Sequence, residues 1–275
     1  MKKVRIALIQ MNICREVEEN IRTAARMIRQ AAAQADIVVL PEMFCCLYTN
    51  SAFRAAKEPK GGRIWSALQE AAAENHVWLI GGSMPEEEDG RIYNTCFIFV
   101  REGRQIARHR KVHLFDIAIE GGQHFRESDT FTPGNSYTVF DTEFGKIGVE
   151  ICFDIRFQEL ARITALAGAQ VIFIPAAFNM TTGPAHWELH FRGRAVDNQV
   201  FMCGCAPARD ENGPYVSYAN SIIVSPWGEV TGRLDESAGI LYQELDLALA
   251  DRIRAQLPIM QNRRTDLYEV QWKQK

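Results

Sequence analysis

Apolar and polar residues follow two periodic patterns along the chain, and together these predict strands separated by helices. Residues 4–9 form an apolar run of strand length, and in residues 17–35 apolar side chains recur every three or four positions, as in an amphipathic helix. Unbroken apolar strands between helices indicate sheets that helices cover. The same patterns predict further strands at residues 37–40, 77–80, 95–100, 105–109, 147–151, 171–174 and 200–205, helices around residues 64–71, 160–167 and 186–198, and a hairpin turning at residues 226–228.

The second half of this pattern resembles the first, which predicts an internal repeat. Both halves follow the order strand, helix, strand, helix, strand, hairpin. Residues 35–44 overlay residues 169–178 with alanine, proline and phenylalanine coinciding. No linker rich in Pro, Gly or Ser separates the halves. We therefore expect residues 1–275 to form a single α/β domain with half-repeats at about residues 1–135 and 136–250.

Composition excludes several classes of protein. The 31 Lys and Arg residues against 34 Asp and Glu give a net charge of −3, so no basic excess favours nucleic acid or an acidic membrane as a partner. The N-terminal residues lack the apolar core of a signal peptide, and no apolar run approaches the roughly 20 residues of a membrane span. The seven cysteines are an odd number in a long chain, which indicates free thiols and a reducing, cytoplasmic location.

Two residues with chemical potential stand where the half-repeats differ. Glu42 follows the second predicted strand, where the other copy has Ala176, and Cys152 follows a strand where the other copy has about Met11. Ligands of α/β sheets gather at the carboxyl ends of strands, so both residues could share one crevice. Cys152 also precedes a helix, where backbone N–H groups favour a thiolate and bind an oxyanion. A surface acid and a buried apolar thiol are the alternatives.

A third candidate lies in the basic segment 108–113, after the first hairpin. Spacing does not choose between Arg110 and Lys111. Chemistry favours lysine, because an ammonium both stabilises an oxyanion and transfers a proton, whereas arginine stays protonated. The alternative is a solvated edge strand.

A metal or thiol-redox module is a weaker hypothesis from another class. His186 and His190 lie four positions apart on a predicted helix, but Glu188 has the wrong offset for an H-E-x-x-H site. Cys203 and Cys205 lack the C-x-x-C spacing of zinc sites. No glycine-rich nucleotide signature is present, so the sequence predicts neither a metal nor an organic cofactor.

The three candidates lie in segments that resemble the catalytic segments of the nitrilase superfamily of carbon–nitrogen hydrolases. These segments are Leu-Pro-Glu-Met-Phe at 40–44, Arg-Lys-Val-His-Leu at 110–114 and Glu-Ile-Cys-Phe-Asp-Ile-Arg-Phe at 150–157, and their order and spacing also match. The resemblance runs over about residues 3–268. Further segments are similar to the ω-amidase branch, namely residues 81–87, 93–96, 113–117, 125–128, 177–188, 194–199 and 263–268.

The resemblance implies an αββα sandwich of four layers with a pseudo-twofold repeat, assembled into homodimers or larger homo-oligomers. It implies hydrolysis of a small amide through a cysteine thioester, without a cofactor. The ω-amidase branch implies 2-oxoglutaramate or 2-oxosuccinamate as substrate, with a dicarboxylate and ammonia as products. The alternatives are another amidase of the superfamily, an N-carbamoyl-amine amidohydrolase, or a binding protein that has lost activity.

Carried over by position, the resemblance implies that Cys152 is the nucleophile, Glu42 the proton acceptor and Lys111 the proton donor. The Phe153 backbone N–H would help to hold the oxyanion, and Glu127 matches a second glutamate beside the triad. Substrate-binding residues are expected beside the catalytic segments, at Tyr48, Phe178 and Thr182.

Two questions stay open in the sequence. An anionic substrate needs a cationic partner, and the candidates are Lys111, Arg156, Arg192 and Arg194. Glu150 departs from the family pattern, which often has a small or apolar residue there. In a strand, Glu150 would share a face with Cys152 and raise the thiol pKa. This hypothesis predicts that Glu150→Gln shifts the acid limb of kcat/KM.

Overall fold

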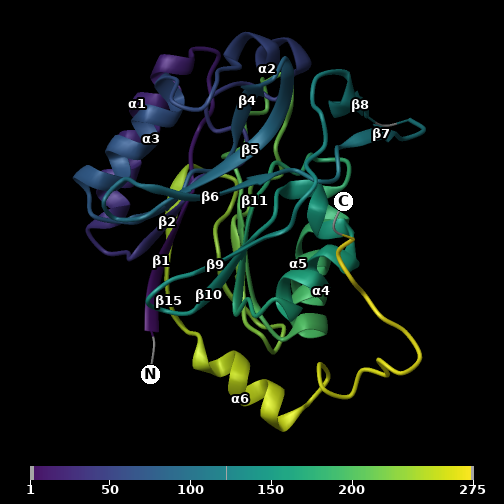
Figure 1. Ribbon diagram of the computed structural model, residues 1–275. Coiled ribbons are helices and arrows are strands. Elements are labelled where there is room, and N and C mark those ends of the chain that lie inside the picture. The colour runs from purple at the N-terminus through teal and green to yellow at the C-terminus, as the bar shows by residue number, and fades with distance from the viewer. Residues whose placement is uncertain (1–2, 122, 274–275) are drawn as a thin grey trace.

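Alternate side chains of the first strand enter two different cores, and this alternation defines the layers of the molecule. The computed structural model describes residues 3–121 and 123–273. In β1 (Lys3–Gln10), Val4 and Leu8 belong to a core between two sheets, whereas Ile9 belongs to a core between the first sheet and its helices. Figure 1 shows helices α1 and α3 on one side of the sheets and α4 and α5 on the other. The predicted αββα sandwich is therefore confirmed.

The first sheet has a parallel centre made of β1, β2 (Ile37–Val39) and β3 (Trp78–Ile80). Its strand order is β15-β1-β2-β3-β5-β4, with β6 paired to β5. The outer strands are antiparallel to their neighbours and comprise β4 (Met84–Glu88), β5 (Arg91–Phe99), β6 (Gln105–Arg110) and β15 (Gly239–Asp246). Helices α1 (Val17–Ala32) and α3 (Arg63–Glu74) cover the sheet with buried residues spaced three and four positions apart.

The second sheet repeats this plan. Its order is β14-β13-β12-β11-β10-β9, and its parallel centre comprises β10 (Lys146–Val149), β11 (Val171–Pro175) and β12 (Phe201–Cys205). Antiparallel strands flank this centre at β9 (Thr138–Asp141), β13 (Ile222–Val224) and β14 (Val230–Arg233). Helices α4 (Gln158–Leu166) and α5 (Gly183–Asn198) cover it. In each sheet, three parallel strands lie between antiparallel ones, which is the predicted internal repeat.

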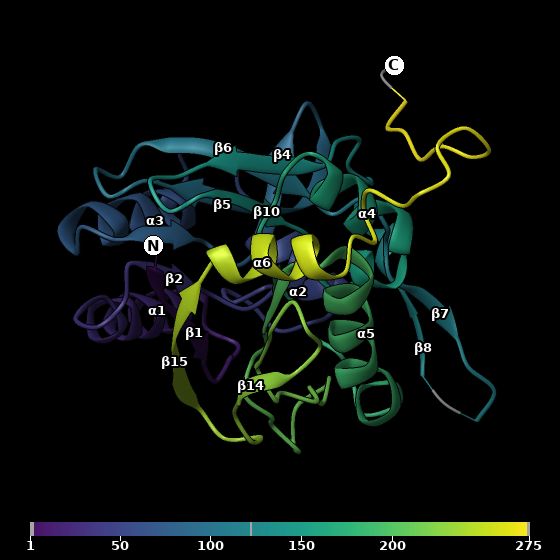
Figure 2. The same ribbon diagram turned by 90° about the horizontal axis from the view of Figure 1, so that it is seen from below.

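Several elements were not predicted from the periodicity. They are α2 (Asn50–Ala56), β4, β9, β15, α6 (Ala248–Gln256), the hairpin of β7 (Asp116–Ala118) and β8 (His124–Arg126), and two 3₁₀ turns, η1 (Glu127–Asp129) and η2 (Cys152–Arg156). In Figure 2 the β7–β8 hairpin extends away from the sheets. Most of these elements are short or half-exposed, so their sequences carry little periodic signal.

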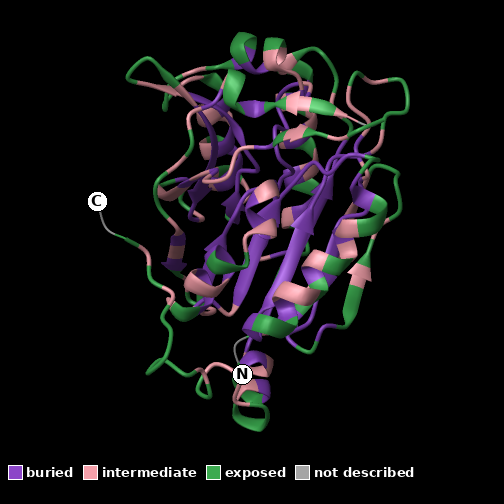
Figure 3. Cartoon of the chain, turned by 90° about the vertical axis from the view of Figure 1, so that its right-hand side faces the viewer, coloured by how far each residue is buried: buried purple, intermediate pink, exposed green. Residues whose placement is uncertain are grey.

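The sheets are the buried layers of the molecule, and the outer faces of the helices are exposed. In Figure 3 the central strands are buried, and exposed residues lie on the outer faces of the helices and in the loops. Within the described residues, no helix is long and apolar enough to cross a membrane. The carboxyl ends of β2, β10 and β11 lead directly into the segments that carry Glu42, Cys152 and Ala177.

Candidate active site

Cys152 lies in a constrained turn between β10 and η2. Its φ of +47° is in the left-handed region that non-glycine residues rarely adopt. The side chain is buried, and the Ala177 N–H, which follows β11, donates to Sγ at 3.5 Å. Burial raises the pKa of the Cys152 thiol, the charge of Glu42 adds to the rise, and the Lys111 ammonium opposes it. The next residue, Phe153, lies in the first turn of η2, where backbone N–H groups lack intrahelical acceptors.

Glu42 follows β2 and directs one carboxylate oxygen to three hydrogen-bond donors. Its Oε1 accepts from Lys111 Nζ at 2.8 Å, from Asn94 Nδ2 at 2.9 Å and from the Tyr48 hydroxyl at 3.2 Å. The other oxygen, Oε2, is buried and has no hydrogen-bond partner among residues 3–121 and 123–273. Burial raises the pKa of the Glu42 carboxyl, the Lys111 ammonium lowers it, and the Glu127 charge raises it.

Lys111 follows β6 and places its ammonium between two buried carboxylates. Nζ lies 2.8 Å from Glu42 Oε1 and 2.8 Å from Glu127 Oε2. Burial by itself would lower the pKa of Lys111, but the charges of Glu127 and Glu42 raise it above its ordinary value. The side chain is therefore a permanent cation and donor at neutral pH.

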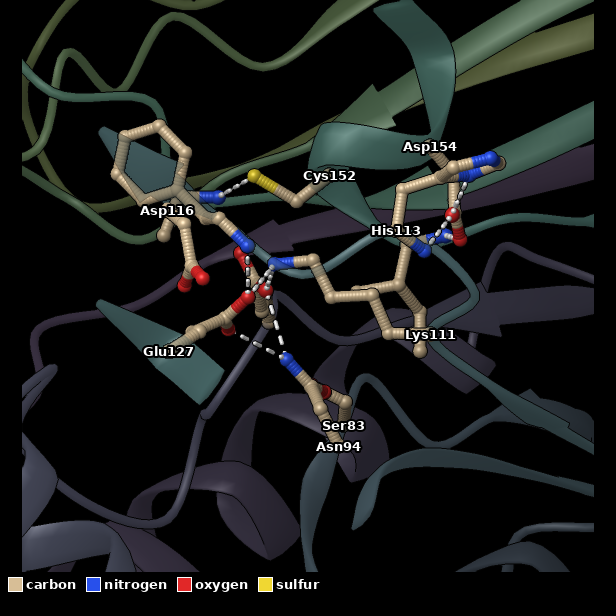
Figure 4. Close-up of polar contacts among 12 residues, drawn as sticks. Ser83, Asn94, Lys111, His113, Asp116, Glu127, Cys152 and Asp154 are labelled. Carbon is tan, nitrogen blue, oxygen red and sulfur yellow. Dashed lines mark hydrogen bonds and ion pairs between the residues drawn. The ribbon is translucent and has the colours of Figure 1, made fainter. Parts of the chain in front are cut away.

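Glu127 opens η1 and is held from three directions. Its Oε2 accepts from the Phe115 N–H at 2.6 Å, and its Oε1 accepts from the Tyr48 hydroxyl at 2.9 Å and from Asn94 Nδ2 at 3.3 Å. Figure 4 shows Lys111 reaching Glu127, with Cys152 beside them. The structure thus brings together Glu42, Lys111, Glu127 and Cys152.

Asp154 joins the lysine segment to the cysteine turn. Its Oδ1 accepts from the His113 N–H at 2.9 Å and lies 2.8 Å from His113 Nδ1. Its Oδ2 accepts from the Ile151 N–H at 3.0 Å and lies 3.0 Å from His109 Nε2. His109 and His113 lie two residues before and after Lys111, so one buried carboxylate fixes Lys111 relative to Cys152. Burial would raise the pKa of Asp154, but these contacts hold it well below its ordinary value.

A family model described as carbon–nitrogen hydrolase matches residues 5–255. The chain belongs to the carbon–nitrogen hydrolases of the nitrilase superfamily. It is 45% identical over 274 residues to the human protein named omega-amidase NIT2, covering 99% of each chain, and 45% identical over 271 residues to the zebrafish omega-amidase NIT2, covering 98% of each. The yeast Nit3 structure, titled a member of branch 10 of the nitrilase superfamily, superposes with a TM-score of 0.88 at 38% identity, covering 96% of this chain and 97% of that one.

One candidate cation in this carbon–nitrogen hydrolase has no acidic partner. Arg156 is half-buried, and it forms no ion pair with any acidic side chain among the described residues. Its guanidinium carbon lies 4.9 Å from the ring centroid of Phe178 and 5.6 Å from that of Phe153. Its Nη1 lies 3.1 Å from His186 Nδ1 and 3.2 Å from His190 Nε2, so a guanidinium faces both imidazoles of the suspected metal pair.

The other three candidate cations already have hydrogen-bond or ion-pair partners. Arg192 bonds Glu188 and the Gly228 carbonyl, while Arg194 donates to the carbonyls of Ile155 and Arg156. Lys111 is held by its two carboxylates. Arg156 is therefore the cation best placed to meet an anionic group near Cys152.

The three predicted substrate-binding residues, Tyr48, Phe178 and Thr182, have different surroundings. The Tyr48 hydroxyl bonds both Glu42 and Glu127, so it faces the carboxylates. Phe178 packs edge-on against Trp187 at 5.1 Å and lies under Arg156. Thr182 is buried and bonds Asn179. Their substrate contacts stay predictions.

Sequence reasoning missed two residues that border the site. Asn94 in β5 bonds both buried carboxylates. Tyr215, in the loop before β13, donates to the Ala177 carbonyl and packs 4.5 Å from the Tyr48 ring. Both tyrosines and Ala177 line a cavity of about 40 Å³ beside Glu42. Asn94 lies in segment 93–96, which resembles the ω-amidase branch, but that resemblance indicated no role for it; no segment of the resemblance contains Tyr215.

The premise that Glu150 and Cys152 lie on one face of a strand is wrong. β10 ends at Val149 and the left-handed turn at Cys152 breaks the strand alternation on which that prediction rested. Both carboxylate oxygens of Glu150 are buried without a partner among the described residues. Burial and the Asp154 charge raise the pKa of Glu150 to about 8, while the charges that act most on the Cys152 thiol are those of Glu42 and Lys111.

Proposed function

We propose that this carbon–nitrogen hydrolase is an ω-amidase that converts a small dicarboxylate monoamide, such as 2-oxoglutaramate or 2-oxosuccinamate, into the dicarboxylate and ammonia. The observation that carries the proposal is Arg156, a half-buried cation four residues after Cys152 that has no acidic partner among the described residues. A neutral amide has no group for such a cation. The ω-amidase names of the human and zebrafish relatives support the same substrate class.

The acylation half of the reaction follows from the geometry of the triad. Because burial and Glu42 raise the thiol pKa, Cys152 is a neutral thiol in the free enzyme, and its proton passes to Glu42 as sulfur attacks the amide carbon. Lys111 and the Phe153 N–H stabilise the negative oxygen of the tetrahedral intermediate. The C–N bond then breaks, the proton on Glu42 goes to nitrogen, and ammonia leaves a thioester on Cys152.

The deacylation half uses the same base. Glu42 takes a proton from a water molecule, which attacks the thioester carbon, and Lys111 again stabilises the oxyanion. The C–S bond breaks, the proton returns from Glu42 to sulfur, and the carboxylic acid leaves and releases its remaining proton to solvent. Glu127 holds the Lys111 ammonium at 2.8 Å through both halves.

Substrate recognition is proposed to place the distal carboxylate on Arg156, with Phe178, Thr182 and Tyr48 around the chain of the substrate. The Phe178 ring lies 4.9 Å from the guanidinium carbon, within the range of a cation–π contact. A guanidinium binds a carboxylate with paired hydrogen bonds, which selects substrates by charge and by length.

We also propose that residues 1–275 act as one domain with half-repeats at about residues 1–135 and 136–250, working as a homodimer in the cytoplasm. Apolar side chains are exposed on the outer layer formed by α4, α5 and the β13–β14 turn: Leu166, Leu189, Val196 and Trp227. An interface between two copies would bury this surface. All seven cysteines are free thiols, which fits a reducing compartment.

The test is ammonia release across a panel of 2-oxoglutaramate, succinamate, glutamine, asparagine, an N-carbamoyl amine, a nitrile and a neutral amide of similar length. We expect the dicarboxylate monoamides to be turned over fastest. Arg156→Met should lower kcat/KM for them by about 10²-fold, the value of one charge-assisted carboxylate contact, and affect the neutral amide far less. Arg192→Met removes a cation from the adjacent helix as the matched control. Equal losses on charged and neutral amides would refute the assignment.

A further inference from the structure

The hydrogen bonds around Glu42 are unevenly divided between its two oxygens. Three donors converge on Oε1, from Lys111, Asn94 and Tyr48, at 2.8, 2.9 and 3.2 Å. Oε2 has no hydrogen-bond partner among the described residues, and the Cys152 thiol is near enough that each group affects the pKa of the other. A carboxylate oxygen without donors is the more basic of the two, so Oε2 is the oxygen prepared to receive a proton.

Two of these donors, Asn94 and Tyr48, are uncharged, and Asn94 comes from a strand inside the first sheet. It lies in β5, which pairs with β3, β4 and β6, and its side chain is buried. Its Nδ2 donates to Glu42 Oε1 at 2.9 Å and to Glu127 Oε1 at 3.3 Å, so one amide group bridges both carboxylates. Figure 4 shows the Asn94 amide nitrogen directed at Glu127.

The orientation of this amide costs a hydrogen bond. The carbonyl oxygen Oδ1 of Asn94 is buried without a partner among the described residues. Turning the amide over would instead direct Oδ1 at two carboxylates, which repel it. A buried acceptor is therefore left unsatisfied so that both N–H groups face Glu42 and Glu127.

The balance of charge explains why these donors are needed. Glu42 and Glu127 are two buried carboxylates that share one ammonium, that of Lys111. Burial and the Glu127 charge raise the pKa of the Glu42 carboxyl, and a Glu42 that is already protonated cannot accept the proton of Cys152. Donors that add no charge of their own stabilise the ionised form while leaving the total charge of the site unchanged.

We propose that Asn94 is a positioning residue that keeps Glu42 ionised and turned so that Oε2 receives the Cys152 proton. The proposal rests on the proposed roles of Glu42 and Cys152. It implies that the Asn94 amide acts on the base of the reaction through hydrogen bonds and does not contact the substrate.

Replacing Asn94 tests this through the pH dependence of the reaction. In Asn94→Ala, Glu42 loses a donor to its charged form, so its pKa should rise and the acid limb of kcat/KM should move by about one pH unit toward alkaline pH. In Asn94→Asp, which keeps the shape but adds a third carboxylate, the limb should move further in the same direction. KM should change little.

Thr95→Val is the matched control, because Thr95 is the next residue of β5 and its buried hydroxyl donates at 2.7 Å to Glu86, outside the site. It should leave the acid limb in place. If Asn94→Ala does not fold, Asn94→Ser, which keeps one donor, should show the shift in the same direction with a smaller size.

A second measurement does not depend on the substrate. The rate at which iodoacetamide alkylates Cys152, located by mass mapping, should have its pH dependence displaced in the same way in Asn94→Ala. Failure of the ω-amidase assignment would leave this displacement intact. An alkylation profile and an acid limb that both coincide with those of Thr95→Val would overturn the role of Asn94.

Discussion

Replacing Glu150 by glutamine should stabilise the protein, and the gain should grow as the pH rises. Glu150 is buried with both carboxylate oxygens unpartnered among the described residues, and the Asp154 carboxylate is the strongest charge acting on it. Burial and this charge raise its pKa from 4.5 to about 8. The folded protein therefore retains a proton that the unfolded chain releases between these two pH values.

The difference in the Glu150 pKa between the folded and unfolded states sets how its effect on the free energy of unfolding changes with pH. Below pH 4.5 Glu150 is protonated in both states and costs nothing; above that pH the unfolded state gains free energy by ionising, so stability falls until about pH 8. At about 1.4 kcal/mol per pH unit, the penalty is about 3 kcal/mol at pH 7 and about 4 kcal/mol at pH 8, and it levels off at about 5 kcal/mol above that pH. Relaxation of the buried site reduces both figures.

Urea unfolding of the wild type and Glu150→Gln at pH 5, 6, 7 and 8 measures this penalty directly. The difference in the free energy of unfolding should widen steadily with pH, whereas the exposed Glu229→Gln supplies the background of removing one carboxylate. Glutamine adds a constant offset, so the slope is the diagnostic quantity. A difference that does not change with pH would refute the reasoning. The acid limb of kcat/KM should stay unchanged, contrary to the hypothesis drawn from strand alternation.

Two further predictions concern the groups that hold the nucleophile and the lysine together. Lys111→Met should lower kcat by at least about 10²-fold, because it removes an oxyanion donor; single-turnover rates in a variant that still folds would check this, and near-normal turnover would contradict it. Asp154→Asn should cost about 3 kcal/mol at pH 7, because four N–H or imidazole contacts lose their carboxylate. That contribution is present above about pH 4 and is lost as the pH falls toward the lower pKa of the folded protein, so unfolding curves of variant and wild type should converge in acid.

The sequence predicts the parallel centres of both sheets because those strands are buried on both faces and read as unbroken apolar runs. β15 escapes prediction because its residues are half-buried and its partner, β1, lies at the other end of the chain. Strands that pair across so many residues do so only in the assembled sheet, and the hydrophobic pattern of β15 alone does not indicate this pairing.

In the candidate site, too, some residues are predictable from the sequence and others are not. Glu42, Lys111 and Cys152 stand out because each ends a predicted strand or hairpin with reactive chemistry. Asn94 lies in the middle of a strand and reads as an ordinary buried polar residue, since its partner Glu42 is 52 positions away. The strand face that Glu150 was predicted to share with Cys152 does not exist, because β10 ends at Val149 and the backbone at Cys152 enters the left-handed region.

The central claim is that Cys152 carries the acyl group of the substrate during turnover. Rapid acid quench of the enzyme mixed with 2-oxoglutaramate, followed by mass spectrometry of the digested protein, should find an acyl adduct on the Cys152 peptide. The adduct should appear with the first equivalent of ammonia and be missing in Cys152→Ala, which should release no ammonia. Ammonia release that persists in Cys152→Ala would contradict the account.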